Sequence, residues 1–219
     1  MKRALTALAL AAIACTTAIG SAPEPVRPIT SGPDALTPAQ QARADSGRPP
    51  YTRADVKFMQ GMIGHHAQAI VMAGWAPTHG ARADVQVLAE RIAVAQRDEI
   101  ASMQRWLRDR REDVPDAVAH HEHAGMDMPG MKMPAMMPGM LTAEQFAKLD
   151  AARGPAFDLL FLTYMIQHHQ GAVTMVKELL AVPAAGQDDD VFRFVADVNV
   201  DQTTEIDRMR SMLATMPRP

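Results

Sequence analysis

The sequence MIGHHAQAIVM occupies residues 62–72, and it returns 103 residues later as MIQHHQGAVTM in residues 165–175. Six of the eleven positions are identical in the two copies. The likeness continues downstream at an offset of 106, where Gln96, Glu99, Ile100 and Met103 match Gln202, Glu205, Ile206 and Met209. The chain therefore contains an internal repeat, and we expect the three extra residues of the second copy to lie in its inter-helix turn.

Each copy of the repeat predicts a pair of helices. Apolar residues follow the helical period, and proline and glycine interrupt it at 77–80 and again at 183–186, where short turns are needed. The predicted long helices are Thr52 to about Ala76, Ala81 to about Arg110, Pro155 to about Ala181 and Asp188 to about Met216. Because Gly154-Pro155 breaks the pattern, Thr142 to about Arg153 is predicted to be a separate short helix.

A two-helix hairpin cannot bury its apolar stripe alone, so the two hairpins should pack against each other. The predicted fold is all-α, an antiparallel four-helix bundle with a pseudo-two-fold axis. Its first hairpin is residues 51–110, and its second, with the short helix, is residues 142–219. Residues 111–141 form a flexible linker rich in histidine and methionine.

The paired histidines are placed to face the bundle interior. At 100° per residue they fall on the apolar stripe of each first helix, together with methionines four residues before the second histidine. Residues at that spacing lie side by side, so a sulfur and a ring nitrogen can converge on one ion. The candidate metal ligands in the bundle are His65, His66, His168, His169, Met62, Met165, Met72 and Met175.

Two interpretations of these histidines are open. A methionine at helical spacing is usually core, and a buried histidine is usually satisfied by hydrogen bonds. Four inward imidazoles are harder to satisfy, because each unpaired buried nitrogen costs about 1–3 kcal/mol and few other polar groups are available. We therefore favour a metal site, with Glu99 and Glu205 as further ligands or as acceptors for the imidazoles.

A second group of candidate ligands lies between the two copies of the repeat. It comprises His120, His121, His123, Met126, Met128, Met131, Met133, Met136, Met137 and Met140. Interleaved prolines and glycines exclude a regular helix, so the segment is expected to wrap an ion with several thioethers. The alternatives are an interaction surface for the methionines and nonspecific metal binding for the histidines.

The ligand types indicate which metal is expected. Thioethers select Cu(I), imidazoles suit Cu(I), Cu(II) and Zn(II), and hard oxygen ligands would be expected for Mg or Ca. Copper fits the combination of ligands best. Zinc is less favoured, because it suits only the histidine-glutamate cluster of the linker. A thioether needs no deprotonation and is not consumed by disulfide formation, which suits a site outside the cytoplasm.

The N-terminus predicts export. Residues 1–14 combine a basic start with an apolar run too short to span a bilayer, as in a cleaved secretory signal. Cys15, the sole cysteine, follows a stretch that resembles a lipobox and is a candidate for lipidation, although ordinary cleavage after Ala14 or Gly20 is the alternative. Residues 15–50 are expected to be a flexible tether. We expect a periplasmic or other extracytoplasmic protein that touches the membrane only through this lipid.

Composition and motifs exclude several classes of function. Without its leader the chain has 20 basic side chains against 25 acidic ones, which argues against nucleic-acid binding. It contains no Gly-x-Ser-x-Gly, no phosphate-binding loop and no His-Glu-x-x-His. The absence of Glu-x-x-His makes a di-iron oxidase improbable. We expect no enzymatic activity.

The duplicated Met-Ile-x-His-His pattern, the Glu-Ile-x-x-Met segment of each partner helix and the leader together resemble the bacterial secreted domain-of-unknown-function 305 family. The resemblance covers about residues 51–110 and 155–216. It implies a ferritin-like fold and, from some members, periplasmic copper binding, with the two histidine pairs as the carried-over positions. Gly64 and Gln167 differ between the copies, so the two halves need not be equivalent.

These observations predict an exported protein that coordinates Cu(I) or Cu(II) for copper tolerance, buffering or delivery. Its expected partners are copper ions and a copper exporter or metallochaperone. Two other functions are considered: a redox enzyme that oxidises Cu(I) at the same sites, and a structural envelope protein that binds no metal.

Overall fold

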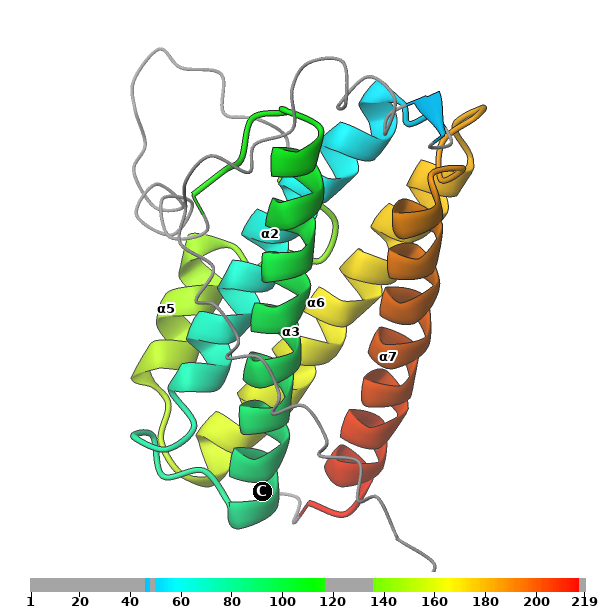
Figure 1. The fold of residues 1–219 in the computed structure, drawn as a ribbon. Coiled ribbons are helices and arrows are strands. Elements are labelled where there is room, and N and C mark those ends of the chain that lie inside the picture. Colours follow the sequence, from blue (N-terminus) through cyan, green and yellow to red (C-terminus); the bar gives the residue numbers. More distant parts are fainter. Residues whose placement is uncertain (1–45, 48–49, 117–135, 217–219) are drawn as a thin grey trace, which may run out of the picture. The chain divides into compact units, whose positions relative to one another are not determined.

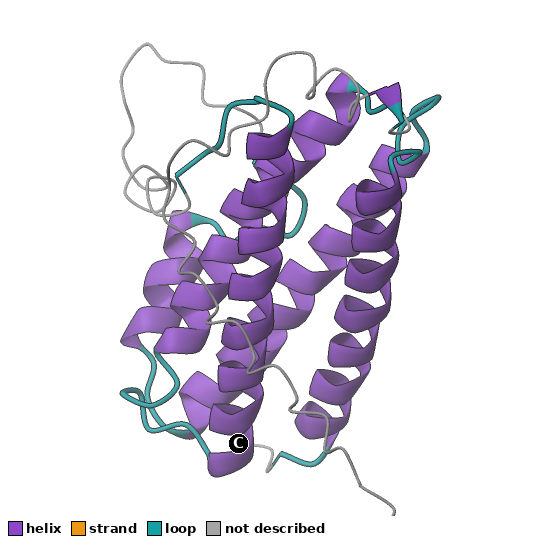
Figure 2. Cartoon of the chain, in the orientation of Figure 1, coloured by secondary structure: helices purple, strands orange, loops and turns teal. Residues whose placement is uncertain are grey.

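The computed structural model describes residues 46–47, 50–116 and 136–216, all within one compact unit, Ala44–Pro219. In these ranges the regular elements are helices joined by loops (Figure 2). They are α2 (Arg53–Gly74), α3 (Ala83–Asp109), α5 (Ala143–Ala151), α6 (Pro155–Leu180) and α7 (Asp189–Ala214). The all-α prediction is confirmed, and each predicted helix end lies within two residues of the observed one.

Local chemistry explains where the helices begin. Thr52 caps α2 by accepting from the Asp55 amide, while the Asp55 carboxylate accepts from the Thr52 amide at 2.7 Å. Thr142 and Gln145 form the same reciprocal capping box at the start of α5. Asp188 caps α7 with its own carboxylate. Polar groups that would be unsatisfied at these ends are therefore paired.

The four long helices form two hairpins, and α2 and α6 join them. Within the hairpins α2 packs on α3 and α6 packs on α7, while α5 lies against α2 and α6 (Figure 1). This arrangement is the predicted four-helix bundle. The first helices of the two repeats, α2 and α6, pack against each other and join the hairpins. None of the described helices combines the length and the apolar character needed to cross a membrane.

The core consists of two apolar clusters with a polar layer between them. One cluster includes Met62, Met103 and Met175, and the other includes Met72 and Met165. Along α2 the first cluster reaches Ala67 and the second begins at Ala69. On all four long helices, the boundary between the two clusters lies at the same level of the bundle. The buried polar side chains at this level are His65, His66, Gln68, Gln96, His168, His169 and Gln202. The bundle therefore places its histidines at mid-height.

The extra residues of the second repeat lie in a helix and not in a turn. Residues 75–82 and 181–188 join the helices of the two hairpins, so the turns have equal length. Helix α6 ends at Leu180, three residues past the position that corresponds to Gly74 in α2. The prediction of a longer second turn is wrong. Leu179, within this extension, is buried, and its burial stabilises the additional helical residues.

Candidate metal centre

The four predicted histidines meet in the polar layer. His65 and His66 of α2 and His168 and His169 of α6 are all fully buried. The rings of His65 and His168 lie across the α2–α6 interface with centroids 3.8 Å apart and planes inclined by 38°. The outer pair, His66 and His169, faces the partner helices α3 and α7. The structure thus brings together side chains separated by about a hundred residues.

Hydrogen bonds determine which ring nitrogen carries the proton. His66 Nε2 lies 2.6 Å from a Glu99 oxygen, and His169 Nε2 lies 2.7 Å from a Glu205 oxygen. His65 Nε2 lies 3.0 Å from the carbonyl oxygen of Pro138. Carbonyl and carboxylate oxygens accept, so Nε2 donates in all three bonds. Of the two predicted roles of Glu99 and Glu205, the structure supports that of acceptors for the imidazoles.

The other ring nitrogens are buried without a partner among the described residues. Nδ1 of all four histidines is unpaired, and in His168 Nε2 is unpaired as well. A buried polar atom without a hydrogen bond costs about 1–3 kcal/mol, so such a group calls for an explanation. A neutral imidazole whose Nε2 donates presents a lone pair at Nδ1, which is the form that binds metals. The layer therefore offers free nitrogen donors.

Burial keeps the inner pair of histidines, His65 and His168, uncharged. Desolvation, followed by the charge of His66, lowers the pKa of His65 to about 3, and the Pro138 hydrogen bond only partly opposes this. Desolvation and then the charge of His65 lower the pKa of His168 well below its ordinary value, and an interaction with the His65 backbone, too poorly aligned to count as a hydrogen bond, only partly opposes this. Both rings are neutral at neutral pH, which is the state required of a metal ligand.

Acid should destabilise the metal-free protein between about pH 6.5 and pH 3. An unfolded histidine binds a proton near pH 6.5, whereas His65 in the folded protein stays neutral down to about pH 3. The unfolded state binds more protons in this window, so the contribution of each such histidine to the free energy of unfolding is fully present above about pH 6.5. Below that pH, each of them lowers the free energy of unfolding by about 1.4 kcal/mol for every pH unit. Urea unfolding with a chelator at several pH values checks this. His168→Leu should give a shallower slope, and an unchanged slope would contradict the assignment.

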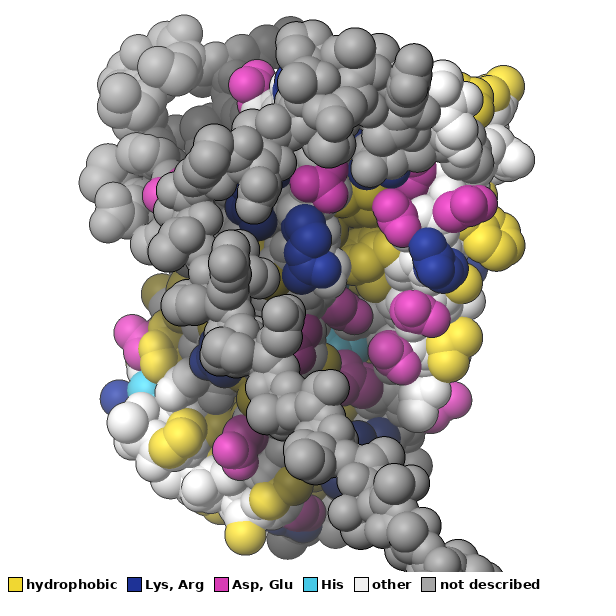
Figure 3. All heavy atoms as spheres, viewed as in Figure 1, with side chains coloured by type: hydrophobic (Ala, Val, Ile, Leu, Met, Phe, Trp, Pro, Cys, Tyr) yellow, Lys and Arg dark blue, Asp and Glu magenta, His cyan; other side chains and the backbone are white. Residues whose placement is uncertain are grey.

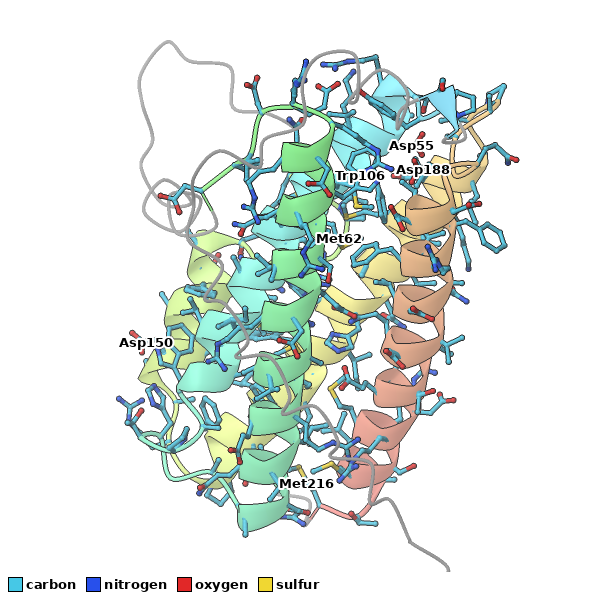
Figure 4. All side chains as sticks on the ribbon, viewed as in Figure 1. Asp55, Met62, Trp106, Asp150, Asp188 and Met216 are labelled. Atoms are coloured by element: carbon cyan, nitrogen blue, oxygen red, sulfur yellow. The ribbon has the colours of Figure 1, made fainter. Side chains whose placement is uncertain are left out.

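The predicted methionines of the bundle line the layer from both sides. Met62, Met72 and Met165 are fully buried and Met175 nearly so, in the two apolar clusters. Met62 points into the bundle (Figure 4). Within the described ranges, no three histidine, cysteine, aspartate or glutamate side chains form a ready-made metal site. The soft donors that the described residues place on the two sides of this level are the buried thioethers.

Most of the linker prediction falls outside the described residues. This holds for His120, His121, His123, Met126, Met128, Met131 and Met133, and equally for the leader, for Cys15 and for nearly all of the tether. The last three linker methionines are described. Met136 is exposed, and Met137 and Met140 are half-buried.

The end of the linker forms a strap, residues 137–141, that crosses α2 and α6 beside the histidines. Besides the His65–Pro138 bond, Gln68 pairs twice with the backbone of Leu141, donating at 3.2 Å and accepting at 2.8 Å. On α6, a Cβ added to Gly171 would stand 2.0 Å from the Pro138 oxygen, so the strap backbone lies directly on the helix. The strap closes the α2–α6 side of the polar layer.

Sequence reasoning missed the strap, although the sequence carries a signal for it. Gln68 in the first repeat corresponds to Gly171 in the second, and Gly64 corresponds to Gln167. The two glutamines hold the strap: Gln68 pairs with Leu141, and the side-chain amide of Gln167 donates to the Gly139 carbonyl oxygen at 3.4 Å. Gly171 leaves room for the strap backbone because it has no side chain. The positions at which the copies differ are thus where the strap breaks the pseudo-symmetry.

The fold and the layer define a class: helical proteins built from a duplicated hairpin with paired, buried histidines at the centre. Residues 55–213 match the family described as Domain of unknown function (DUF305), and the chain belongs to this family. The family resemblance of the histidine repeat is therefore confirmed. A comparison with curated proteins finds no match.

Solved structures share the fold. A DUF305 fragment from Deinococcus radiodurans is 29% identical with a TM-score of 0.62, covering 77% of this chain and 100% of its own. A putative secreted DUF305 protein from Streptomyces coelicolor is 27% identical with a TM-score of 0.60, covering 74% and 92%. CopM in its Cu(II)-bound form is 27% identical with a TM-score of 0.56, covering 73% and 95%. CopM has also been solved with Cu(I) and with Ag bound.

Proposed function

We propose that this protein binds copper through imidazole and thioether ligands and serves copper tolerance, buffering or delivery outside the cytoplasm. The observation that carries the proposal is the set of unpaired ring nitrogens in the polar layer. Protein hydrogen bonds would normally satisfy buried imidazoles. Four unpaired Nδ1 atoms in one layer, flanked by buried thioethers, are better explained by a ligand that binds them.

The donor set fits copper. Imidazole nitrogen binds both oxidation states, and thioether sulfur favours Cu(I). CopM, which shares the fold, has been solved with Cu(II), with Cu(I) and with Ag. Zinc is less favoured, because the sulfurs beside the layer are thioethers and not thiolates.

In the proposed mechanism the linker methionines capture Cu(I) and the histidine layer retains copper. Glu99 and Glu205 keep the Nε2 proton on His66 and His169, so that Nδ1 is the ligand atom, and their negative charge offsets that of the ion. The proposed role is coordination without turnover. The Cu(I)-oxidising alternative would instead consume oxygen when Cu(I) is supplied.

The proposed location is extracytoplasmic. The leader in residues 1–14 supports it, with Cys15 as the site of a lipid anchor, and the Streptomyces coelicolor relative is a putative secreted protein. A copper exporter or metallochaperone is the proposed partner. The acidic balance of the mature chain gives no support to nucleic-acid binding.

Copper titration of the mature protein tests the proposal. Replacing His65, His66, His168 and His169 with alanine should remove the copper bound by the bundle, and replacing the seven linker methionines with leucine should remove the copper bound by the linker. His79→Ala is the matched control, because both nitrogens of this buried histidine already have partners. Circular dichroism verifies that each variant is helical. If neither variant loses copper, or if Cu(I) is turned over with oxygen consumption, the proposal is wrong.

A further inference from the structure

One seam of the bundle is less closed than the others. The α2–α3 and α6–α7 pairs pack directly, and α2 and α6 pack and carry the strap. Helices α3 and α7 make at most marginal contact with each other along their length. Figure 1 shows them as neighbours on the near side of the molecule with a space between their ribbons. Of the seams between adjacent long helices, the α3–α7 seam therefore has the least backbone contact, although the histidines behind it are fully buried.

A hollow of about 320 Å³ lies in this seam. Its walls include Met103 and Trp106 of α3 and Phe194 and Asp197 of α7, and Met59 of α2 reaches it from the core. The two methionines are almost fully buried, so the hollow extends from solvent to the thioethers of the apolar cluster. The hollow thus ends at Met103 and Asp197, about one helical turn from Glu99 and Asp201.

Carboxylates gather where the seam passes the histidines. Glu99 on α3 and Glu205 on α7 hold the outer imidazoles and are each about one-fifth exposed. Asp201, exposed on α7, interacts electrostatically with both of them and with Asp197. Burial and then these three negative charges raise the pKa of the Asp201 carboxyl. Figure 3 shows acidic side chains on both sides of the seam and histidine in its depth.

Unpaired buried polar groups lie behind these carboxylates. Gln96, one turn before Glu99, is 1% exposed and both its amide atoms lack a hydrogen-bond partner among the described residues. Gln202, beside Asp201, is 2% exposed and its amide oxygen also lacks one. The amide oxygens of Gln96 and Gln202 and the free Nδ1 atoms of the outer histidines carry lone pairs that a cation would satisfy.

We propose that copper ions reach the histidine layer through the α3–α7 seam, and that Asp201, with Glu99 and Glu205, attracts them there. This inference rests on the proposed copper binding and adds the route to it. A local excess of negative charge at the entrance to a site concentrates cations there and raises their association rate. Asp201 makes no bond to an imidazole, so its role is to steer the ion rather than to hold it. Arg105 and Arg193 line the upper hollow and place positive charge away from this point.

Stopped-flow association of Cu(II) with the mature protein tests the route. The quenching of tryptophan fluorescence reports binding, since Trp106 lines the hollow. The linker methionines are changed to leucine and His120, His121 and His123 to alanine, so that the signal comes from the bundle. Asp201→Asn should slow association about threefold at low ionic strength, and the difference should vanish near 1 M salt, where charges are screened within about 3 Å.

Asp207→Asn is the matched control, because it removes the same charge from the same helix at a side chain that is 71% exposed. This variant should associate at the wild-type rate. Equal rates for Asp201→Asn and Asp207→Asn would overturn the route while leaving copper binding intact. Faster dissociation from Asp201→Asn with unchanged association would also overturn it, because Asp201 would then be a ligand. Failure of the unsubstituted bundle to bind copper would instead overturn the proposed function itself.

Discussion

Replacing His168 with leucine should stabilise the metal-free protein by about 1–3 kcal/mol and weaken copper binding by the bundle. Both ring nitrogens of His168 are buried without a partner among the described residues, and leucine fills a similar volume without a polar atom. The ring contact with His65 is lost, and this reduces the gain. Urea unfolding in the presence of a chelator measures the first effect, and copper titration measures the second.

His79→Leu is the control for this experiment. His79 is also buried, but its Nδ1 lies 2.9 Å from the Thr78 hydroxyl and its Nε2 lies 2.8 Å from the Asp150 carbonyl oxygen. Removing a satisfied histidine loses these two hydrogen bonds, each worth about 0.5–1.5 kcal/mol, so this variant should be destabilised by about 1–3 kcal/mol. If both variants lose stability alike, the nitrogens of His168 have partners and the argument for a ligand at this position fails.

Opposite effects on stability and binding would show that the polar layer is maintained for a ligand. A core selected for stability alone would contain apolar side chains at these four positions, as it does one turn away at Met62 and Met165. A ligand selective for the folded state restores stability in proportion to the logarithm of its concentration. Copper should therefore raise the unfolding temperature of the wild-type protein more than that of His168→Leu.

Sequence reasoning succeeded where the determining interactions are local. The four long helices follow from apolar periodicity and from the proline and glycine that interrupt it. Local capping of α2 by Thr52 and of the short helix α5 by Thr142 acts within three residues. The inward direction of His65 and His66 follows from the same periodicity, and duplication extends it to His168 and His169. Repetition of one pattern made the four-helix bundle the expected way to bury both stripes.

Sequence reasoning failed where contacts join residues that are distant in the sequence. The Gln68–Leu141 pair spans 73 residues, and no local pattern indicates that a glutamine on a helix will hold a linker. That Glu99 accepts a hydrogen bond from His66 also depends on how α2 and α3 pack, because the two residues are 33 positions apart. The sparse contact between α3 and α7 depends on how the two hairpins pack on each other, which the composition of neither helix determines.

The strap makes Gly171 a position on α6 that does not tolerate a side chain. We expect Gly171→Ala to destabilise the protein by about 2–4 kcal/mol, because overpacking and a lost hydrogen bond add up. The added methyl group would meet backbone atoms of Pro138 and Gly139 at 2.0–2.5 Å, and no side-chain rotation can relieve that contact. The strap must move, and His65 Nε2 then loses its acceptor.

Gly74→Ala provides the comparison, since Gly74 is also helical and a Cβ there meets nothing within 4 Å. This variant should gain up to about 1 kcal/mol from better helix propensity. Urea unfolding measures both variants, and hydrogen exchange of the Leu141 amide, which donates to Gln68, reports the strap directly. That amide should exchange faster in Gly171→Ala. Equal stability of the two variants with a protected Leu141 amide would mean that the strap is held by α2 and does not rest on α6 in solution.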